Sequence, residues 1–171
     1  MAHVDLQTGE DVTVWRILED GALPDEAGEW LVPLGRLKDE AGSLLEEKGV
    51  RIGALIETDT PHSDLAGIGN YASFAAIRFP GFGDGRGFSL AVRLRKDYGF
   101  NGDIRAIGHV IPDQAQFLLR AGFNTSEVPE ERREAFVRAV NRYKHVYQSD
   151  TQGGISVLRQ RHDQAGARRV S

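Results

Sequence analysis

The chain has 171 residues, of which 40% are hydrophobic and 27% charged, and its formal net charge is −4 at pH 7. This is the composition of a globular domain with a sizeable core, so whole-chain disorder is excluded, as are disulfides, cysteine-bound zinc and thiol catalysis, since the chain has no cysteine. The longest uninterrupted apolar run, Phe74 to Ile77, is far shorter than the ~20 residues of a membrane span, so we expect no membrane partner.

The charges are unevenly spread along the chain. Residues 1–80 carry a net −9, residues 81–121 a net +2 and residues 122–171 a net +3. A nucleic-acid-binding domain is usually basic, so we expect no nucleic-acid partner. Two interpretations of the asymmetry stay open: an ordinary solvated surface, or an acidic face for a protein partner beside a basic pocket for a small anion. The first residues lack a basic and then apolar leader, so we expect a cytoplasmic location.

Hydrophobic periodicity in the first half predicts strands that alternate with helices. Residues 12–17 alternate as in an edge strand, residues 30–34 form a strand that Pro33 ends, and residues 51–56 form a third. A helix runs from Leu37 and ends at Gly49, and a weak short helix covers 64–71.

The second half continues the rhythm. Residues 74–79 are almost all apolar, which is typical of a strand buried on both faces. A glycine-rich loop then leads to a helix over 88–98, a strand over 104–110, a helix from Pro112 to Gly122 and a strand over 125–128. The last helix begins near Glu130 and has an apolar stripe. The stripe consists of Phe136, Ala139, Val140, Tyr143 and Tyr147.

This alternation predicts an α/β fold with a mostly parallel sheet of five to six strands and crossover helices on both faces. An incomplete βα barrel is the alternative, because a full eight-unit barrel needs roughly 250 residues. Residues 1–148 are expected to form a single domain, and residues 149–171 a polar and flexible tail.

The glycine-rich loop Gly81 to Gly87 is the most informative segment. It joins a buried strand to a helix, where parallel sheets bind ligands and where free backbone N–H groups favour an anion. We therefore predict a ligand site at this loop. Its residues are Asp84, Gly85, Arg86, Gly87 and Ser89. Two alternatives stay open: Asp84 and Arg86 pair with each other in a simple turn, or the loop docks a protein. The glycines match neither a dinucleotide fingerprint nor a P-loop.

A second group lies on the next strand and its exit. Arg105 and His109 are four residues apart, so in a strand they point to one face, and Gln114 follows in the next helix. We place these three in the same ligand site. Arg93 is expected near the sheet edge and Arg95 in solvent. No catalytic constellation and no metal site are identifiable.

Several motifs together resemble a bacterial family. They are Asp84-Gly85-Arg86-Gly87-Phe88-Ser89, Gly102-Asp103-Ile104-Arg105-Ala106 and Asp113-Gln114. The similarity covers about residues 77–128. The family is uncharacterised, and its members are commonly encoded beside assimilatory sulfite reductase. Its members are described as oxidoreductases of sulfite reduction.

The resemblance implies a role in sulfur assimilation, with sulfite reductase components as partners. We predict an accessory protein that binds an oxyanion or a phosphate-bearing ligand at the glycine-rich loop. One alternative is a small oxidoreductase with a bound flavin or nicotinamide, although the fingerprint for such a cofactor is missing. Another is a ligand-free protein-interaction scaffold.

Overall fold

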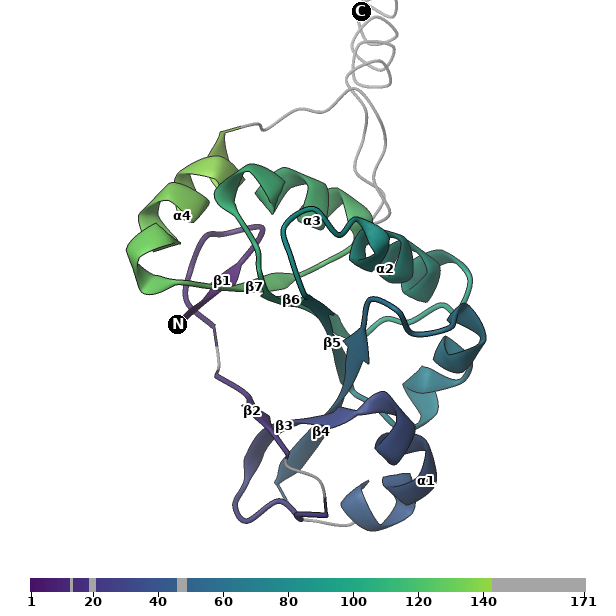
Figure 1. The fold of residues 1–171 in the computed structure, drawn as a ribbon. Helices are drawn as coiled ribbons and strands as arrows, with labels where there is room; N and C mark the ends of the chain where they lie inside the picture. Colours follow the sequence, from purple (N-terminus) through teal and green to yellow (C-terminus); the bar gives the residue numbers. More distant parts are fainter. Residues whose placement is uncertain (13, 19–20, 46–48, 143–171) are drawn as a thin grey trace, which may run out of the picture.

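The computed structural model describes residues 1–142 except 13, 19–20 and 46–48 (Figure 1). In that part of the chain the strands are β1 (Ala2–Asp5), β2 (Arg16–Ile17), β3 (Gly28–Pro33), β4 (Val50–Glu57), β5 (Phe74–Phe79), β6 (Asp103–Gly108) and β7 (Thr125–Val128). The α-helices are α1 (Leu34–Leu45), α2 (Arg86–Lys96), α3 (Ala115–Ala121) and α4 (Arg133–Asn141). Short 3-10 turns are η1 (His62–Leu65), η2 (Ile68–Asn70), η3 (Pro112–Gln114) and η4 (Glu130–Arg132).

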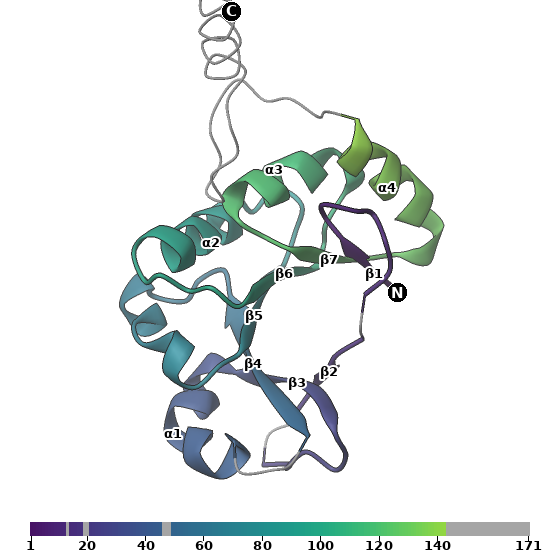
Figure 2. The same ribbon diagram turned by 180° about the vertical axis from the view of Figure 1, so that it is seen from behind.

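All seven strands join one curled sheet in the order β1-β7-β6-β5-β4-β3-β2. Neighbours are parallel except β1 and β7, which are antiparallel. Strands β2 to β7 lie in the sheet in the same order as in the chain, so each connection moves one strand further in the same direction. Connections between parallel strands are almost always right-handed, so connections that all advance in one direction place their helices on the same face of the sheet. Figures 1 and 2 show the helices on the outer, convex side of the curl.

The α/β prediction is therefore confirmed, and two of its details are corrected. The sheet has seven strands instead of five or six, because the short strand β1 pairs with β7, with His3 opposite Glu127. The helices cover one face instead of both, because a sheet that winds in one direction curls into a half-barrel. The incomplete barrel was the better description.

The main core lies between the convex face of the sheet and the helices. On β5, Ala75, Ile77 and Phe79 face this core and are at most 1% exposed. Phe74 and Ala76 of the same strand are fully buried on the concave face. The prediction that residues 74–79 are buried on both faces is confirmed, with Arg78 partly exposed.

A smaller apolar cluster fills the concave face. Its members are Trp15, Leu31, Leu55, Phe74, Ala76 and Ile107. Trp15 directly precedes β2, and its ring lies edge-on to the ring of His3 on β1 with centroids 3.9 Å apart. Since β1 and β2 are the two edges of the sheet, this contact links them across the open side of the half-barrel. Burial lowers the pKa of His3 below its ordinary value.

Several element boundaries differ from the predictions. The strand expected over 12–17 is reduced to Arg16–Ile17, and it is an edge strand as expected. The weak helix over 64–71 is two 3-10 turns. Helix α4 ends at Asn141. Tyr143, Tyr147 and the tail predicted for 149–171 lie outside the described residues. No helix in the described part combines the length and apolarity that crossing a membrane requires.

Candidate functional site

A cavity of about 660 Å³ lies at the carboxyl edge of the sheet, where β2 to β5 end. Parallel sheets usually bind ligands at this edge, and the volume lies within the range of small-molecule sites. The lining residues include Ile17, Pro33, Lys38, Leu55, Glu57, Asp59, Asp64 and Arg78. The wall therefore combines an apolar floor with a charged rim.

Two ion pairs form the charged rim. Arg78 Nη1 lies 2.9 Å from Glu57 Oε1, and these residues are paired neighbours at the ends of β5 and β4. Lys38 Nζ of α1 lies 3.2 Å from Asp64 Oδ1 of η1. All four side chains are between 34% and 47% exposed. Ion pairs this exposed contribute only about 0–1 kcal/mol, so a ligand can replace either carboxylate at small cost.

The glycine-rich loop adjoins this cavity through the end of β4. Thr58, between the lining residues Glu57 and Asp59, donates its hydroxyl to Asp84 Oδ2 at 2.7 Å. Arg86 donates from Nε to Asp84 Oδ1 at 2.9 Å and from Nη2 to Oδ2 at 2.7 Å. These bonds hold the pKa of Asp84 well below its usual value, and the carboxylate raises the pKa of Arg86.

The Asp84–Arg86 pair is one of the alternatives that the sequence left open. The Arg86 side chain is 61% exposed, and the Nε–Nη2 side of its guanidinium is occupied by Asp84. An anion that binds this guanidinium in the same way must therefore compete with Asp84. Binding of an anion at the loop stays a prediction.

Other predicted site residues have clear positions near the loop. Gly87 opens α2 against Phe79: a Cβ at this glycine would lie 2.6 Å from two atoms of that ring, so only glycine allows this packing. Gln114 donates from Nε2 to the carbonyl of Phe82 at 2.8 Å, which ties η3 to the loop. Gly85 and Ser89 are exposed. The structure thus brings Asp84, Arg86 and Gln114 to one region.

Arg105 and His109 do not share a face. Strand β6 ends at Gly108, which has φ +88° and sits so close to the Phe79 carbonyl that a Cβ would lie 2.6 Å from its oxygen. This turn breaks the alternation, so His109 is exposed, whereas Arg105 is 4% exposed on the concave face. Arg105 instead pairs with Glu29, near the amino end of the sheet.

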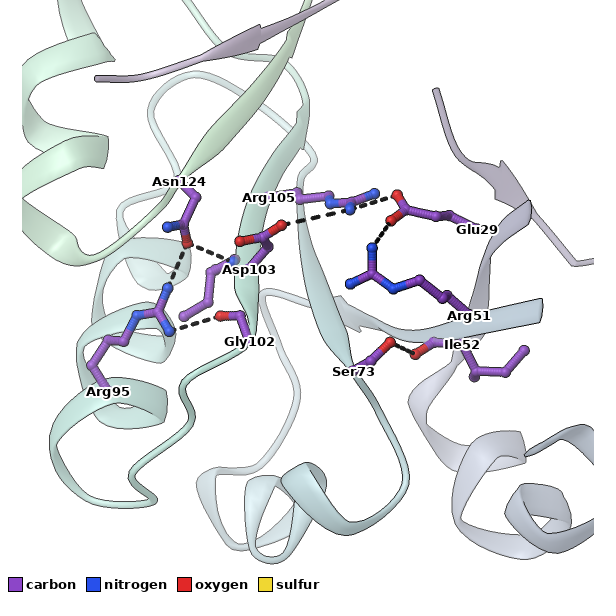
Figure 3. Close-up of polar contacts among 10 residues, drawn as sticks. Glu29, Arg51, Ile52, Ser73, Arg95, Gly102, Asp103, Arg105 and Asn124 are labelled. Atoms are coloured by element: carbon purple, nitrogen blue, oxygen red, sulfur yellow. Dashed lines mark hydrogen bonds and ion pairs between the residues drawn. The ribbon is translucent and has the colours of Figure 1, made fainter. Parts of the chain in front are cut away.

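The expected positions of two helix α2 arginines are reversed. Arg93 is exposed and pairs with Asp97 at 3.1 Å. Arg95 turns inward and donates to the carbonyls of Phe100, Gly102 and Gly122 (Figure 3 shows its contacts with Gly102 and Asn124). Burial lowers the pKa of Arg95. Because its guanidinium binds the carbonyls of Phe100, Gly102 and Gly122, its role is to hold loops together.

An apolar groove of about 620 Å³ lies between α2 and α3, beside the loop. Its walls are Phe88, Val92, Gln114, Phe117, Arg120 and Ala121. Phe117 is 60% exposed, and Phe82, whose carbonyl Gln114 binds, is 67% exposed. Exposed aromatic side chains that flank an apolar groove are typical of surfaces that dock a protein.

Sequence reasoning missed the residues of the cavity rim. Lys38, Glu57 and Arg78 come from three separate elements, and no motif joins them. One signal was present: Arg78 is the only charged residue in the apolar run 74–79, near the carboxyl end of a buried strand. A charge at that position costs free energy in a strand buried on both faces unless it reaches water or a partner.

Comparison with known proteins adds a family and no activity. A family model described as "Bacterial protein of unknown function (DUF934)" matches residues 53–158. The matched range begins within β4 and includes the glycine-rich loop and the groove between α2 and α3. None of the curated proteins matches the chain.

Proposed function

The chain belongs to the bacterial family of unknown function DUF934, and we propose that this member is an accessory protein of assimilatory sulfate and sulfite reduction that binds an oxyanion or phosphate-bearing ligand. The ligand occupies the carboxyl-edge cavity, with Arg78 and Lys38 as its cationic contacts and Arg86 at the adjacent loop. The pathway rests on the resemblance of the motifs around the loop to proteins encoded beside sulfite reductase.

One observation carries the ligand proposal: two arginines of this edge, Arg78 and Arg86, are paired with carboxylates next to a cavity. Glu57 on Arg78 and Asp84 on Arg86 occupy the positions that the oxygens of a sulfur or phosphorus oxyanion would take. The lining residues have one more carboxylate than cations, so a dianion binds only if a carboxylate leaves its cation. Glu57 and Asp64 are 46% and 47% exposed, so a displaced carboxylate can turn to water, where solvent screens its charge, which the buried Glu29 of the amino edge cannot do. The ligand therefore exchanges with Glu57 on Arg78 and, where it extends to the loop, with Asp84 on Arg86.

Removal of the Arg78 guanidinium is expected to weaken ligand binding at least tenfold, because an interaction of an anion with a cation is lost. The measurement is the rise in melting temperature with sulfite, sulfate, phosphate or flavin mononucleotide, which follows affinity by mass action. The variant is Arg78→Ala. Its control is Arg93→Ala, since Arg93 is similarly exposed and also has one ion pair. Equal responses of the two variants would reject the cavity as the site.

The pathway is tested in cells. A strain without this gene is expected to grow on cysteine and to grow poorly on sulfate as its only sulfur source. The wild-type gene restores growth, and Arg78→Ala restores it less well than Arg93→Ala. Normal growth of the deletion strain on sulfate would contradict the proposed pathway, whatever the ligand measurements show.

The groove between α2 and α3 favours a second function for the same protein, which is docking on sulfite reductase. Arg120 of α3 lines it together with Phe88 and Val92 of α2, and the last turn of α2 is basic. An acidic surface with an apolar anchor complements this groove.

Phe117→Ser is expected to weaken binding to purified assimilatory sulfite reductase about tenfold or more, because exposed aromatic anchors contribute much of the affinity at docking surfaces. Surface plasmon resonance measures the affinity. Leu23→Ser is the control, since Leu23 is 58% exposed and lies outside the groove. If both variants bind as the wild type does, the groove does not dock the reductase.

A further inference from the structure

A second cavity, of about 260 Å³, lies at the opposite, amino edge of the sheet. The lining residues are Asp5, Val12, Glu29, Arg51, Asp103, Arg105, Asn124 and Thr125. None of them lines the carboxyl-edge cavity. Its volume is below that of most drug-sized ligand sites, so it is suited to a small molecule.

Arg105 is the central cation of this cavity. Its guanidinium carbon lies 3.9 Å from the centroid of the Phe74 ring and 4.8 Å from that of Trp15. Nη2 lies 2.6 Å from Glu29 Oε2, although the contact is not aligned as a hydrogen bond, and Arg51 binds the other oxygen of Glu29 (Figure 3). One carboxylate thus serves two guanidinium groups.

The cavity wall holds buried donors without acceptors. Nε and Nη1 of Arg105 and Oγ1 of Thr125 have no hydrogen-bond partner within the described part of the chain. Arg105 and Thr125 are register partners on β6 and β7, and they are 4% and 6% exposed. Buried donors that lack partners are unfavourable, and a carboxylate is the acceptor that guanidinium and hydroxyl groups bind best.

The same cavity has an excess of carboxylates. Asp103 is 49% exposed, and its nearest cation, Arg105 Nη2, is 3.9 Å away. With Asp5 and Glu29, the lining has three carboxylates against the two guanidinium groups. A purely anionic ligand would satisfy the donors and worsen this excess. A ligand that has a cationic group beside its carboxylate binds the unpartnered donors and also balances the excess of carboxylates.

We infer that this cavity binds a small α-amino acid in its zwitterionic form. The carboxylate of the ligand accepts hydrogen bonds from Arg105 and Thr125, and its ammonium group faces Asp103 and Asp5. The volume favours an amino acid with a short side chain. This site does not depend on the ligand proposed for the carboxyl edge.

A thermal-shift panel on the full chain tests the ligand class. Glycine, L-alanine and L-serine at millimolar concentration are expected to raise the melting temperature. Acetate and methylamine, which each carry one of the two charges, should raise it much less, as should N-acetyl-L-alanine and L-alaninamide. If the amino acids cause no shift, or if acetate alone is as effective, the inference is overturned.

Thr125→Val separates the ligand role from a structural one. Valine has nearly the same shape as threonine and removes a hydroxyl that has no partner, so the ligand-free variant should be at least as stable as the wild type. Its affinity for L-alanine should fall about tenfold, as expected for the loss of one hydrogen bond to a charged group. Unchanged affinity would contradict the assignment of Thr125.

Asp103→Asn tests the ammonium contact at a partly exposed position, where folding is not at risk. Its affinity for L-alanine should fall several-fold, whereas Asp97→Asn, at an equally exposed carboxylate, should not change it. Equal effects of the two variants would overturn the inference. Arg78→Ala should keep the amino-acid response, which distinguishes this site from the one at the carboxyl edge.

Discussion

Arg95→Met is expected to lower the free energy of unfolding by more than about 3 kcal/mol. The guanidinium of Arg95 makes five hydrogen bonds, to the carbonyls of Phe100, Gly102 and Gly122 and to Asn124 Oδ1 (Figure 3). Methionine fills most of the same space and donates nothing, so partly buried carbonyls lose their donors. Urea unfolding followed by circular dichroism measures the loss.

The control for this prediction is Arg93→Met on the same helix. Arg93 is exposed and has one ion pair with Asp97, so its replacement is expected to change stability by less than about 1 kcal/mol. A similar loss in both variants would mean that helix propensity or net charge, instead of the bridging hydrogen bonds, accounts for the effect of Arg95→Met.

Glu29→Gln is expected to lower stability by about 3–5 kcal/mol, the usual cost of removing one member of a buried ion pair. Glu29 is 8% exposed and faces both Arg51 and Arg105. Arg51 is 54% exposed and can turn to water, whereas Arg105 cannot. Burial already lowers the pKa of Arg105, so the loss of its main counter-charge leaves a desolvated cation. Chemical denaturation measures the change.

Two comparison variants show whether the buried charge is the cause. Glu57→Gln removes an exposed carboxylate that also pairs with an arginine, and it should change stability by about 1 kcal/mol or less. The double variant Glu29→Gln with Arg105→Met should recover part of the loss, because the unpaired cation is gone. If the stability lost in the double variant equals the sum of the losses in the two single variants, Glu29 and Arg105 are not coupled.

The two cavities lie at opposite ends of the same strands. On β4, Arg51 belongs to the amino-edge cavity and Leu55 and Glu57 to the carboxyl-edge cavity. Side chains of the small concave cluster, such as Phe74, lie between these ends. A ligand at one edge can therefore influence binding at the other edge only through this packed cluster. Variants of the carboxyl-edge cavity and variants of the amino-edge cavity should act independently of each other unless the cluster moves.

The local sequence pattern was enough to predict the boundaries of an element where the segment has one dominant hydrophobic periodicity. Strands at 74–79 and 125–128 have the predicted boundaries, because a continuous apolar run and a helix ending at Gly122 leave little choice. The two-residue strand β2 and strand β1 could not be predicted in the same way. Their pairing depends on partners that are distant in the sequence, such as Val128 for Ala2.

The candidate sites were predictable only in part. The glycine-rich loop was found because glycine spacing is a local signal, and its Asp84–Arg86 pair spans three residues. Glu29, Lys38 and Thr125 carry no such signal, since each is a common residue in an ordinary element. They become candidates only when the sheet places them beside Arg78 or Arg105.

By itself the sequence determined the α/β class, the positions of most elements and the family, because these depend on periodicity and motifs within short segments. Only the tertiary structure decided that the sheet curls with its helices on one face, that Arg95 turns inward, and that His109 and Arg105 separate. Each of these depends on which strands become neighbours and which backbone groups are left without partners, and both are properties of the whole packed chain.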